Sequence, residues 1–420
     1  MTARGVAVAV AVVAATAVLA ACPRHHAVPV VTLAPPDAGP ARAVAVPDAA
    51  PAVAVPDAPL EQAIGADTPP PLDDREWLKG STHVHAAPSG DSETPVADVM
   101  RWYESHGYDF IVLTDHNQVT AIDAGTTGSP VVHAPAPGAN GLIVLAGTEL
   151  THNPDGCLPP GDGTPHCRIH VNLLGVTARP QGKLDWTTVA RASKLRVDKY
   201  QAALDQRATL GPSSLAQLNH PQWLWGMTPA LIVELAQRGF QLVEIENAAF
   251  SVWGKGDATH PSVEALWDHA LSHGAHLWGV ASDDAHDYTA GGRYPPGGGW
   301  IVVHAHRTGT SILDAIRDGD FYASTGIELA RVEVTPGREL LVSVAGSPAS
   351  AAQVTTELIT TNGVVIATVR GGEARFAIPI GGYLRARLSR LRLDGTTERA
   401  WTQPVYGPGP QVSQPTGGAR

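Results

Sequence analysis

The side chains that could do chemistry in this sequence are histidines and carboxylates next to short apolar runs. His83 and His85 are separated by one residue, so in an extended segment their side chains point to the same face, about 6.6 Å apart. Two imidazoles so arranged can bind one metal ion, although a lone pair of this kind is more often an ordinary polar feature. Asp284 and His286 repeat the spacing after the apolar residues 280–281.

Further candidate ligands accompany other apolar runs. Folding alone does not explain why imidazoles and carboxylates end one run after another, whereas residues at the carboxyl ends of the strands of a parallel barrel face its active site. Histidine and carboxylate ligands suit Zn, Mn or Fe, and a glutamate can bridge two ions. The additional candidates are Asp91 in the loop 88–91, His116 after 110–114, Glu149 after 142–146, His170 at the start of 170–174, and His220 after 215–219.

Composition limits the classes of protein that the chain can belong to. The 420 residues include 43 Gly, 35 Pro, 18 His and 3 Cys, and their formal net charge is −11. The length suits a large catalytic domain with an accessory domain, and three Cys exclude a disulfide-rich scaffold. The acidic balance argues against nucleic-acid partners. Sixteen of the 18 His lie between His83 and His306, which places the chemistry in the first part of the folded region.

Strands and helices are expected to alternate from residue 76 to about 327. Such alternation predicts an α/β domain with a parallel sheet or barrel, and about 250 residues is the size of a single barrel. The expected helices start after Thr94 as N-cap, span 187–207, and begin at Thr228-Pro229 and His260-Pro261. The expected strands span 110–114, 142–146, 170–174, 215–219, 242–246, 276–281 and 300–304.

The pattern changes after Gly326. Strands are expected at 340–344, 354–360, 364–369, 375–380 and 383–393, several of them with alternating apolar and polar residues. Turns such as Asn362-Gly363 and Asp394-Gly395 separate them. Residues 328–407 are therefore predicted to form a small antiparallel β-sandwich, followed by a disordered tail at 408–420.

The N-terminus has the layout of an export signal. Arg4 precedes an apolar run that ends in Leu19-Ala20-Ala21-Cys22, and such a run is short for a membrane span. The end of the run resembles a bacterial lipobox, in which Cys22 is lipidated; cleavage of an ordinary signal peptide is the alternative. Residues 1–22 are thus predicted to be a lipoprotein signal, with Pro/Ala-rich residues 23–75 as a disordered linker. The expected location is the cell envelope, anchored by lipid to the outer membrane.

The motifs as a set resemble those of the PHP (polymerase and histidinol phosphatase) superfamily. The resemblance rests on His83-Val84-His85, Thr114-Asp115-His116-Asn117, Gly147-Thr148-Glu149, Asn219-His220-Pro221 and Ser282-Asp283-Asp284-Ala285-His286, and it covers about 76–327. The segments 321–326 and 400–406 are similar to the CehA/McbA branch of that superfamily. The implied fold is a distorted (β/α)7 barrel followed by a small β domain.

The resemblance also implies a ligand set and an activity. His83, His85 and Asp284 would hold one ion, and Glu149 would bridge it to a second ion held by His170 and His220. Asp91, His116 and His286 would hold a third. Asp284 is preferred to Asp283 because it keeps the spacing to His286. With two or three divalent ions, such a site would use a metal-bound hydroxide to hydrolyse a small-molecule phosphoester, carbamate or amide ester, with Glu149 and Asp284 as catalytic residues.

Other residues near these motifs have two interpretations each. Asp115 is expected to orient a ligand His by hydrogen bonding rather than to be a metal ligand itself. Cys157 and Cys167 form a disulfide in an exported protein or remain free thiols. Trp223 walls an apolar pocket or packs in the core, and Arg293 holds a phosphate or is simply exposed. The alternative for the whole chain is a non-catalytic surface module that keeps its metals for folding.

Overall fold

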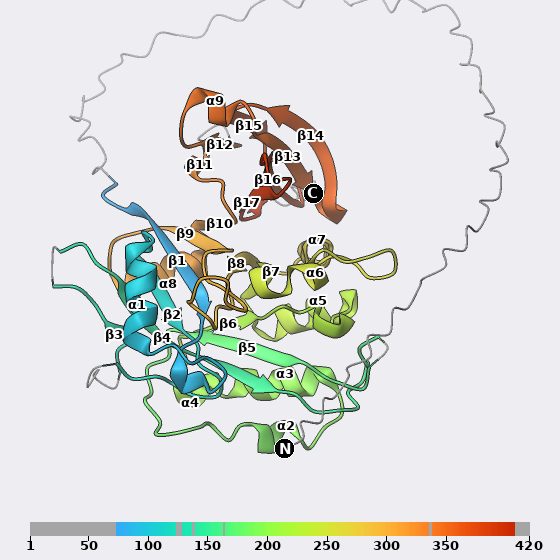
Figure 1. Ribbon diagram of the computed structural model, residues 1–420. Helices are drawn as coiled ribbons and strands as arrows, with labels where there is room; N and C mark the ends of the chain where they lie inside the picture. Colours follow the sequence, from blue (N-terminus) through green and yellow to red (C-terminus); the bar gives the residue numbers. More distant parts are fainter. Residues whose placement is uncertain (1–72, 123–127, 137–138, 163, 336–337, 408–420) are drawn as a thin grey trace, which may run out of the picture. The chain divides into compact units, whose positions relative to one another are not determined.

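The computed structural model describes residues 73–122, 128–136, 139–162, 164–335 and 338–407 (Figure 1). They form a mixed α/β structure with one 15-stranded mixed sheet and a separate three-stranded antiparallel sheet. The predicted export signal, Cys22, most of the linker and the C-terminal tail lie outside the described residues. Among the residues that the structure describes, no helix is long and apolar enough to cross a membrane.

The first part of the chain supplies the strands that carry the candidate ligands. Most of their residues are buried, and several of the strands consist mainly of apolar residues, as expected for strands covered on both faces. In chain order they are β1 (Glu76–Val84), β2 (Phe110–Leu113), β3 (Val131–His133), β4 (Ile143–His152), β5 (Ile169–Leu174), β6 (Leu215–Leu218), β7 (Leu242–Asn247), β8 (Trp278–Ser282) and β9 (Trp300–Ala305).

The sheet is mixed, whereas the alternation of strands and helices predicted a parallel sheet or barrel. Strands β1, β2 and β4 are parallel, and so are β6, β7 and β8, whereas β5 is antiparallel to both β4 and β6. The link from β4 to β5 contains no helix in its described residues, whereas parallel neighbours are usually joined by a crossover helix. The predicted strands exist, but the direction of β5 is reversed.

Nine α-helices and four short 3-10 helices connect the strands in the described residues. Thr228 caps α5 by accepting a hydrogen bond from Leu231 N at 3.2 Å, as predicted, but Thr94 caps nothing, because α1 begins after Pro95 without a side-chain cap. Three helices occupy the range of the predicted helix 187–207.

The bounds of the helices are as follows. The α-helices are α1 (Val96–Ser105), α2 (Thr187–Ala190), α3 (Arg196–Asp205), α4 (Arg207–Leu210), α5 (Pro229–Arg238), α6 (Ser251–Gly254), α7 (Val263–Ser272), α8 (Gly309–Asp318) and α9 (Pro348–Ala351), and the 3-10 helices are η1 (Ala87–Ser89), η2 (Trp223–Trp225), η3 (Ala248–Phe250) and η4 (Thr361–Gly363).

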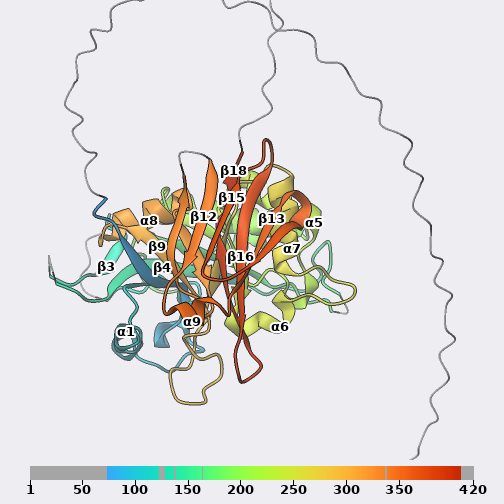
Figure 2. The same ribbon diagram turned by 90° about the horizontal axis from the view of Figure 1, so that it is seen from above.

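The last part of the chain is rich in antiparallel strands, as predicted. Strands β11, β12 and β15 form the separate sheet, whereas β14, β13, β16 and β17 continue the large sheet through β10 and β9. Figure 2 shows β13 and β16 side by side. The strands are β10 (Phe321–Ser324), β11 (Leu329–Val334), β12 (Glu339–Val344), β13 (Thr355–Thr360), β14 (Val364–Arg370), β15 (Glu373–Ala377), β16 (Tyr383–Leu391), β17 (Thr397–Thr402) and β18 (Val405–Tyr406).

A buried ion pair joins β16 to α7. Arg385, whose side chain is 0% exposed, donates Nε and Nη2 to the two carboxylate oxygens of Asp268 at 2.8 and 2.7 Å. Its Nη2 also donates to Glu264 Oε1 at 2.8 Å, and Tyr383 Oη donates to Asp268 Oδ1 at 2.8 Å. Because the carboxylates would be left without this partner, removal of the guanidinium is costly.

We expect Arg385→Met to lower the free energy of unfolding by about 3–5 kcal/mol, because it strands buried carboxylates. Urea unfolding followed by circular dichroism measures the change. Arg331→Met is the matched control, since the Arg331–Glu333 pair has side chains 53% and 45% exposed and exposed pairs contribute at most about 1 kcal/mol. Equal effects of the two substitutions would contradict a stabilising role for the buried pair.

Glu246 on β7 is an acid held in a poor environment for its charge. The pairing of β7 with β8 is irregular between Glu244 and Glu246, and such irregularities redirect side chains. Glu246 lines a cavity that also contains Lys255 and Arg399. Burial raises the pKa of Glu246 from its usual 4.5 to about 7, so in the folded protein the carboxyl takes up a proton at a higher pH than in the unfolded chain.

Between about pH 4.5 and pH 7 the folded protein keeps a proton on Glu246 that the unfolded chain has lost. The free energy of unfolding therefore falls as the pH rises through this range. Glu246→Gln removes that loss. The variant should be more stable than the natural protein at pH 8, by about 1–3 kcal/mol, and the difference should shrink toward pH 5. Urea unfolding at a series of pH values measures it, and a difference that is the same at every pH would contradict the titration of Glu246.

Candidate metal centre

The candidate ligands gather where several strands end. Val84 and Ala285 form an isolated parallel β-bridge, and so do His116 and Glu149. The end of β1 therefore pairs with the segment after β8, and the segment after β2 pairs with β4. His83 and His85 flank Val84, and both side chains are fully buried. Their ring centroids are 5.0 Å apart, which agrees with the same-face arrangement expected from their spacing.

The carboxylate of Glu149 lies at the middle of the cluster. Its side chain is 1% exposed, and five imidazoles surround it. Oε1 is 2.9 Å from His170 Nδ1, 3.5 Å from His83 Nε2 and 3.7 Å from His220 Nε2, and Oε2 is 2.7 Å from His116 Nδ1 and 3.5 Å from His85 Nε2. The two oxygens therefore face different sets of histidines, as a bridging ligand must.

Only one carboxylate of the Asp283-Asp284 doublet faces the cluster. Asp284 Oδ1 is 3.2 Å from His83 Nε2 and 3.3 Å from His85 Nε2. Asp283 instead accepts hydrogen bonds from Tyr103 Oη at 2.9 Å and from the main-chain nitrogens of residues 298 and 299. Asp284 has a left-handed backbone with φ 52°, a conformation that is uncommon outside glycine and gathers at functional sites. This backbone places the two neighbouring carboxylates in different environments.

Asp91 completes a second side of the cluster, near the surface. Asp91 Oδ2 is 3.0 Å from His116 Nε2 and 3.3 Å from His286 Nε2, and the Asp91 side chain is 51% exposed. The ring of His286 stacks on His85 with a centroid distance of 4.1 Å. All nine expected metal ligands are thus brought into one contiguous cluster.

Three overlapping groups in this cluster could hold metal ions. Within each group the candidate ligand atoms lie within 4.8 Å of one another, and the groups are His83–His85–Glu149, Glu149–His170–His220 and His85–Asp91–His116–His286. His83 Nε2, His85 Nε2 and Glu149 Oε2 are buried without a hydrogen-bond partner among the described residues; the approach of His116 Nδ1 to Oε2 lacks hydrogen-bond geometry, and this nitrogen bonds Thr151 Oγ1 at 2.7 Å. Buried polar atoms normally have partners, so these atoms fit metal ligands.

Burial keeps two of the histidines neutral. Burial and the neighbouring rings of His286 and His116 lower the pKa of His85 to about 3. Burial lowers the pKa of His170 to about 4, even though Glu149 opposes the shift. A neutral imidazole has the free lone pair that a metal ion needs, so both rings are in the right state to bind one at neutral pH.

The carboxylates of the cluster are held ionised by their surroundings. Burial would raise the pKa of Glu149, but His170, His116 and His83 lower it well below its usual value. Burial is likewise outweighed at Asp284, whose pKa is lowered by His83 and His85. Against its own burial, His116 has its pKa raised to about 10 by Glu149 and Asp91. A proton on His116 thus offsets part of the negative charge of the carboxylates, and a bound cation would take the place of that proton.

The sequence-based predictions missed the carboxylate of Glu244, which contacts His83 Nδ1 at 2.6 Å. They also missed two amides: Asn219 donates to Glu149 Oε1 at 2.9 Å, and Asn153 Oδ1 is 2.9 Å from His170 Nε2. A glutamate inside the apolar run 242–245 was the available signal for Glu244. Asn219 carried no signal beyond lying next to His220, and Asn153 carried none.

Asp115 positions main chain rather than an imidazole. It accepts hydrogen bonds from Ala86 N at 2.8 Å and from the Thr120 hydroxyl, and burial raises its pKa. Because Ala86 directly follows His85, Asp115 fixes the segment that presents that ligand. This contact differs from the expected bond to a ligand ring.

The two expected substrate residues lie on different sides of the cluster. Arg293 is exposed and lines a cavity of about 850 Å³ together with Asp91, His286 and Tyr294. Trp223 packs edge-on against His170 and His220, with centroid distances of 5.4 and 5.3 Å, and is not among the residues lining this cavity. Arg293 thus lies on a cavity, whereas Trp223 packs against two of the histidines.

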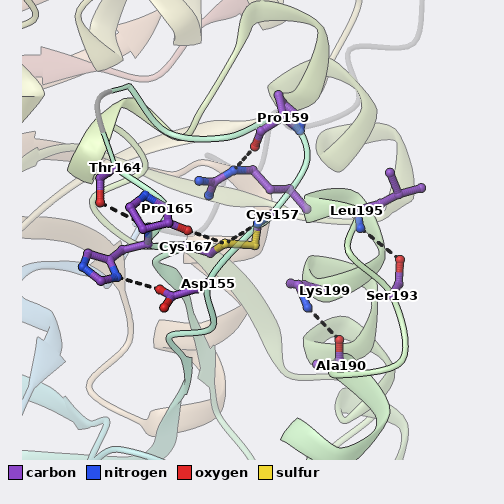
Figure 3. Close-up of a disulfide and its surroundings, with 12 residues drawn as sticks. Asp155, Cys157, Pro159, Thr164, Pro165, Cys167, Ala190, Ser193, Leu195 and Lys199 are labelled. Atoms are coloured by element: carbon purple, nitrogen blue, oxygen red, sulfur yellow. Dashed lines mark hydrogen bonds and ion pairs between the residues drawn. A yellow bond between two sulfur atoms is a disulfide. The ribbon is translucent and has the colours of Figure 1, made fainter.

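Cys157 and Cys167 are joined by a disulfide with an S–S distance of 2.02 Å (Figure 3). The bond closes the insert between β4 and β5, and Cys157 N also donates to Cys167 Sγ at 2.9 Å. Both residues are buried. The disulfide therefore ties down the segment that leads directly into His170.

No family model matches the chain, and a search of curated proteins finds no match.

We expect Asp91→Ala to remove one bound ion while the others remain, because Asp91 belongs to only one of the three groups. Elemental analysis of protein saturated with Zn²⁺ or Mn²⁺ measures the ratio of metal to protein. Asp98→Ala is a control, since Asp98 lines the same cavity but pairs with Arg101. An unchanged ratio in Asp91→Ala would contradict the assignment of Asp91 as a ligand.

Proposed function

We propose that the chain is a metal-dependent hydrolase that uses two or three divalent ions, Zn, Mn or Fe, to cleave a phosphoester or a carbamate or amide ester. The observation that carries the proposal is the convergence of six imidazoles and three carboxylates on one point, with Glu149 facing two groups at once. A purely structural site needs fewer ligands and no adjoining cavity. Here the cluster reaches a cavity through Asp91 and His286.

We further propose that the fold is the distorted seven-unit barrel of the PHP superfamily, followed by a β-sandwich. Support comes from the motif order in the sequence and from ligands that stand at the ends of successive strands. The same proposal includes export and lipid attachment at Cys22, which rest on the N-terminal sequence alone.

The residues of the chain would divide the work of hydrolysis. Divalent ions bound to the cluster would lower the pKa of water and polarise the substrate. Glu149 would contribute a ligand to two ions, one of them also held by His83, His85 and Asp284. Asp91 and His286, at the edge of the cavity, would lie where the scissile bond enters.

The cavity favours a substrate with little negative charge. Four carboxylates line it, from Asp91, Glu93, Asp98 and Asp287, whereas Arg293 is its single Arg or Lys. A multiply charged phosphate would meet this negative field on approach. A phosphodiester, carbamate or amide ester carries less charge and fits the lining better.

Purified protein is expected to hydrolyse one of three probes, an aryl phosphate, a phosphodiester or a naphthyl carbamate, and to lose that activity on chelation. His83→Ala should lower kcat/KM by at least about 10³-fold, because it removes a ligand at the centre of the cluster. His306→Ala is the matched control, since the His306 side chain is 51% exposed and pairs with Asp74.

The β strands at the C-terminal end should stay folded in His83→Ala, as circular dichroism would show. Full activity of this variant would contradict the metal assignment. Full metal occupancy without activity toward any probe would instead favour a non-catalytic module that keeps its ions for stability.

A further inference from the structure

Glu244 is a buried carboxylate at the back of the cluster that makes contacts to several candidate ligands. Its side chain is 0% exposed. It accepts hydrogen bonds from five groups on four chain segments, which are His83 Nδ1 at 2.6 Å, Gln217 Nε2 at 3.2 Å, Ser282 Oγ at 2.6 Å, His220 N at 2.6 Å and Asn247 Nδ2 at 2.8 Å. No hydrogen-bonding capacity is left for a metal ion, so Glu244 acts through its neighbours.

The contact with His83 determines which ring nitrogen is free. N–H and O–H donors surround both oxygens of Glu244, so Glu244 acts as an acceptor and Nδ1 of His83 carries the hydrogen that faces it. Nε2 is then left with its lone pair, and it points to the cluster, 3.2 Å from Asp284 Oδ1. A carboxylate behind a histidine fixes both the tautomer and the orientation of the ring.

The other oxygen of Glu244 acts on two further ligands. Oε2 accepts the main-chain N–H of His220, whose φ of 25° is an unfavourable left-handed value. Oε2 also accepts from Asn247, whose Nδ2 lies 3.3 Å from Asp284 Oδ2. One carboxylate thus contacts His83 directly, His220 through its main chain and Asp284 through one amide.

We infer that Glu244 is a positioning residue, which sets the tautomer of His83 and the placement of His220 and Asp284 and thereby the affinity of the centre for divalent ions. The inference rests on the metal centre of the proposed function and not on hydrolysis, because ion affinity is what it predicts.

The test is the affinity of Glu244→Gln for Zn²⁺, measured by competition with a chromophoric chelator. The amide has nearly the same size but one acceptor oxygen instead of two, so its NH₂ group must face donors, and His83 loses the partner that fixes its tautomer. We expect the Kd to rise about 10–100-fold, with an altered visible spectrum of bound Co²⁺. Glu246→Gln, the same substitution two residues along the same strand, should change the Kd by less than about two-fold, because Glu246 lines a different cavity.

Equal Zn²⁺ affinities of Glu244→Gln and Glu246→Gln would overturn the inference. If circular dichroism shows that Glu244→Gln does not fold, the Zn²⁺ affinity of Glu244→Asp is compared with that of Glu246→Gln instead. The aspartate keeps the carboxylate but moves it away from His83. Weaker binding than in the control supports the inference, and equal binding overturns it. Natural protein that binds Zn²⁺ but hydrolyses no probe would contradict the proposed function and leave this comparison valid.

Discussion

The structure depends on how it accommodates a charged carboxylate, Glu149, that is buried among histidines. Each buried ion costs several kcal/mol unless it is paired or bonded. Here three buried atoms that face the cluster, His83 Nε2, His85 Nε2 and Glu149 Oε2, have no hydrogen-bond partner among the described residues. Their types are those of metal ligands, and ions between them would supply the missing partners.

Backbone conformations and buried polar contacts hold the ligands around Glu149. Asn117, His220 and Asp284 each follow a strand and have left-handed backbones with φ of 51°, 25° and 52°. Such conformations persist only where their surroundings hold them. Glu244 contributes to this at His220, and the cross-strand amide of Asn219 holds Glu149. The strands and these contacts thus hold the ligands in place.

Much of the α/β fold and the cluster could be predicted from local sequence. Buried strands appear as apolar runs, and the ligands stand out because charge follows such runs. The reversed direction of β5 could not be predicted, because it depends on an insert without a crossover helix. The division of 187–207 into three helices and the buried Arg385–Asp268 pair depend on contacts between distant segments. The contact of Glu244 with His83 could not be predicted, because a glutamate in a strand is usually expected to be exposed to solvent.

The most direct test of the central claim is anomalous X-ray diffraction from crystals of the protein saturated with Zn²⁺ or Mn²⁺, recorded at the absorption edge of the metal. The account predicts at least two anomalous peaks, each at about 2.0–2.2 Å from a ligand atom, with one oxygen or both of Glu149 bound to them. Crystals of metal-saturated protein without an anomalous peak at Glu149 would contradict it.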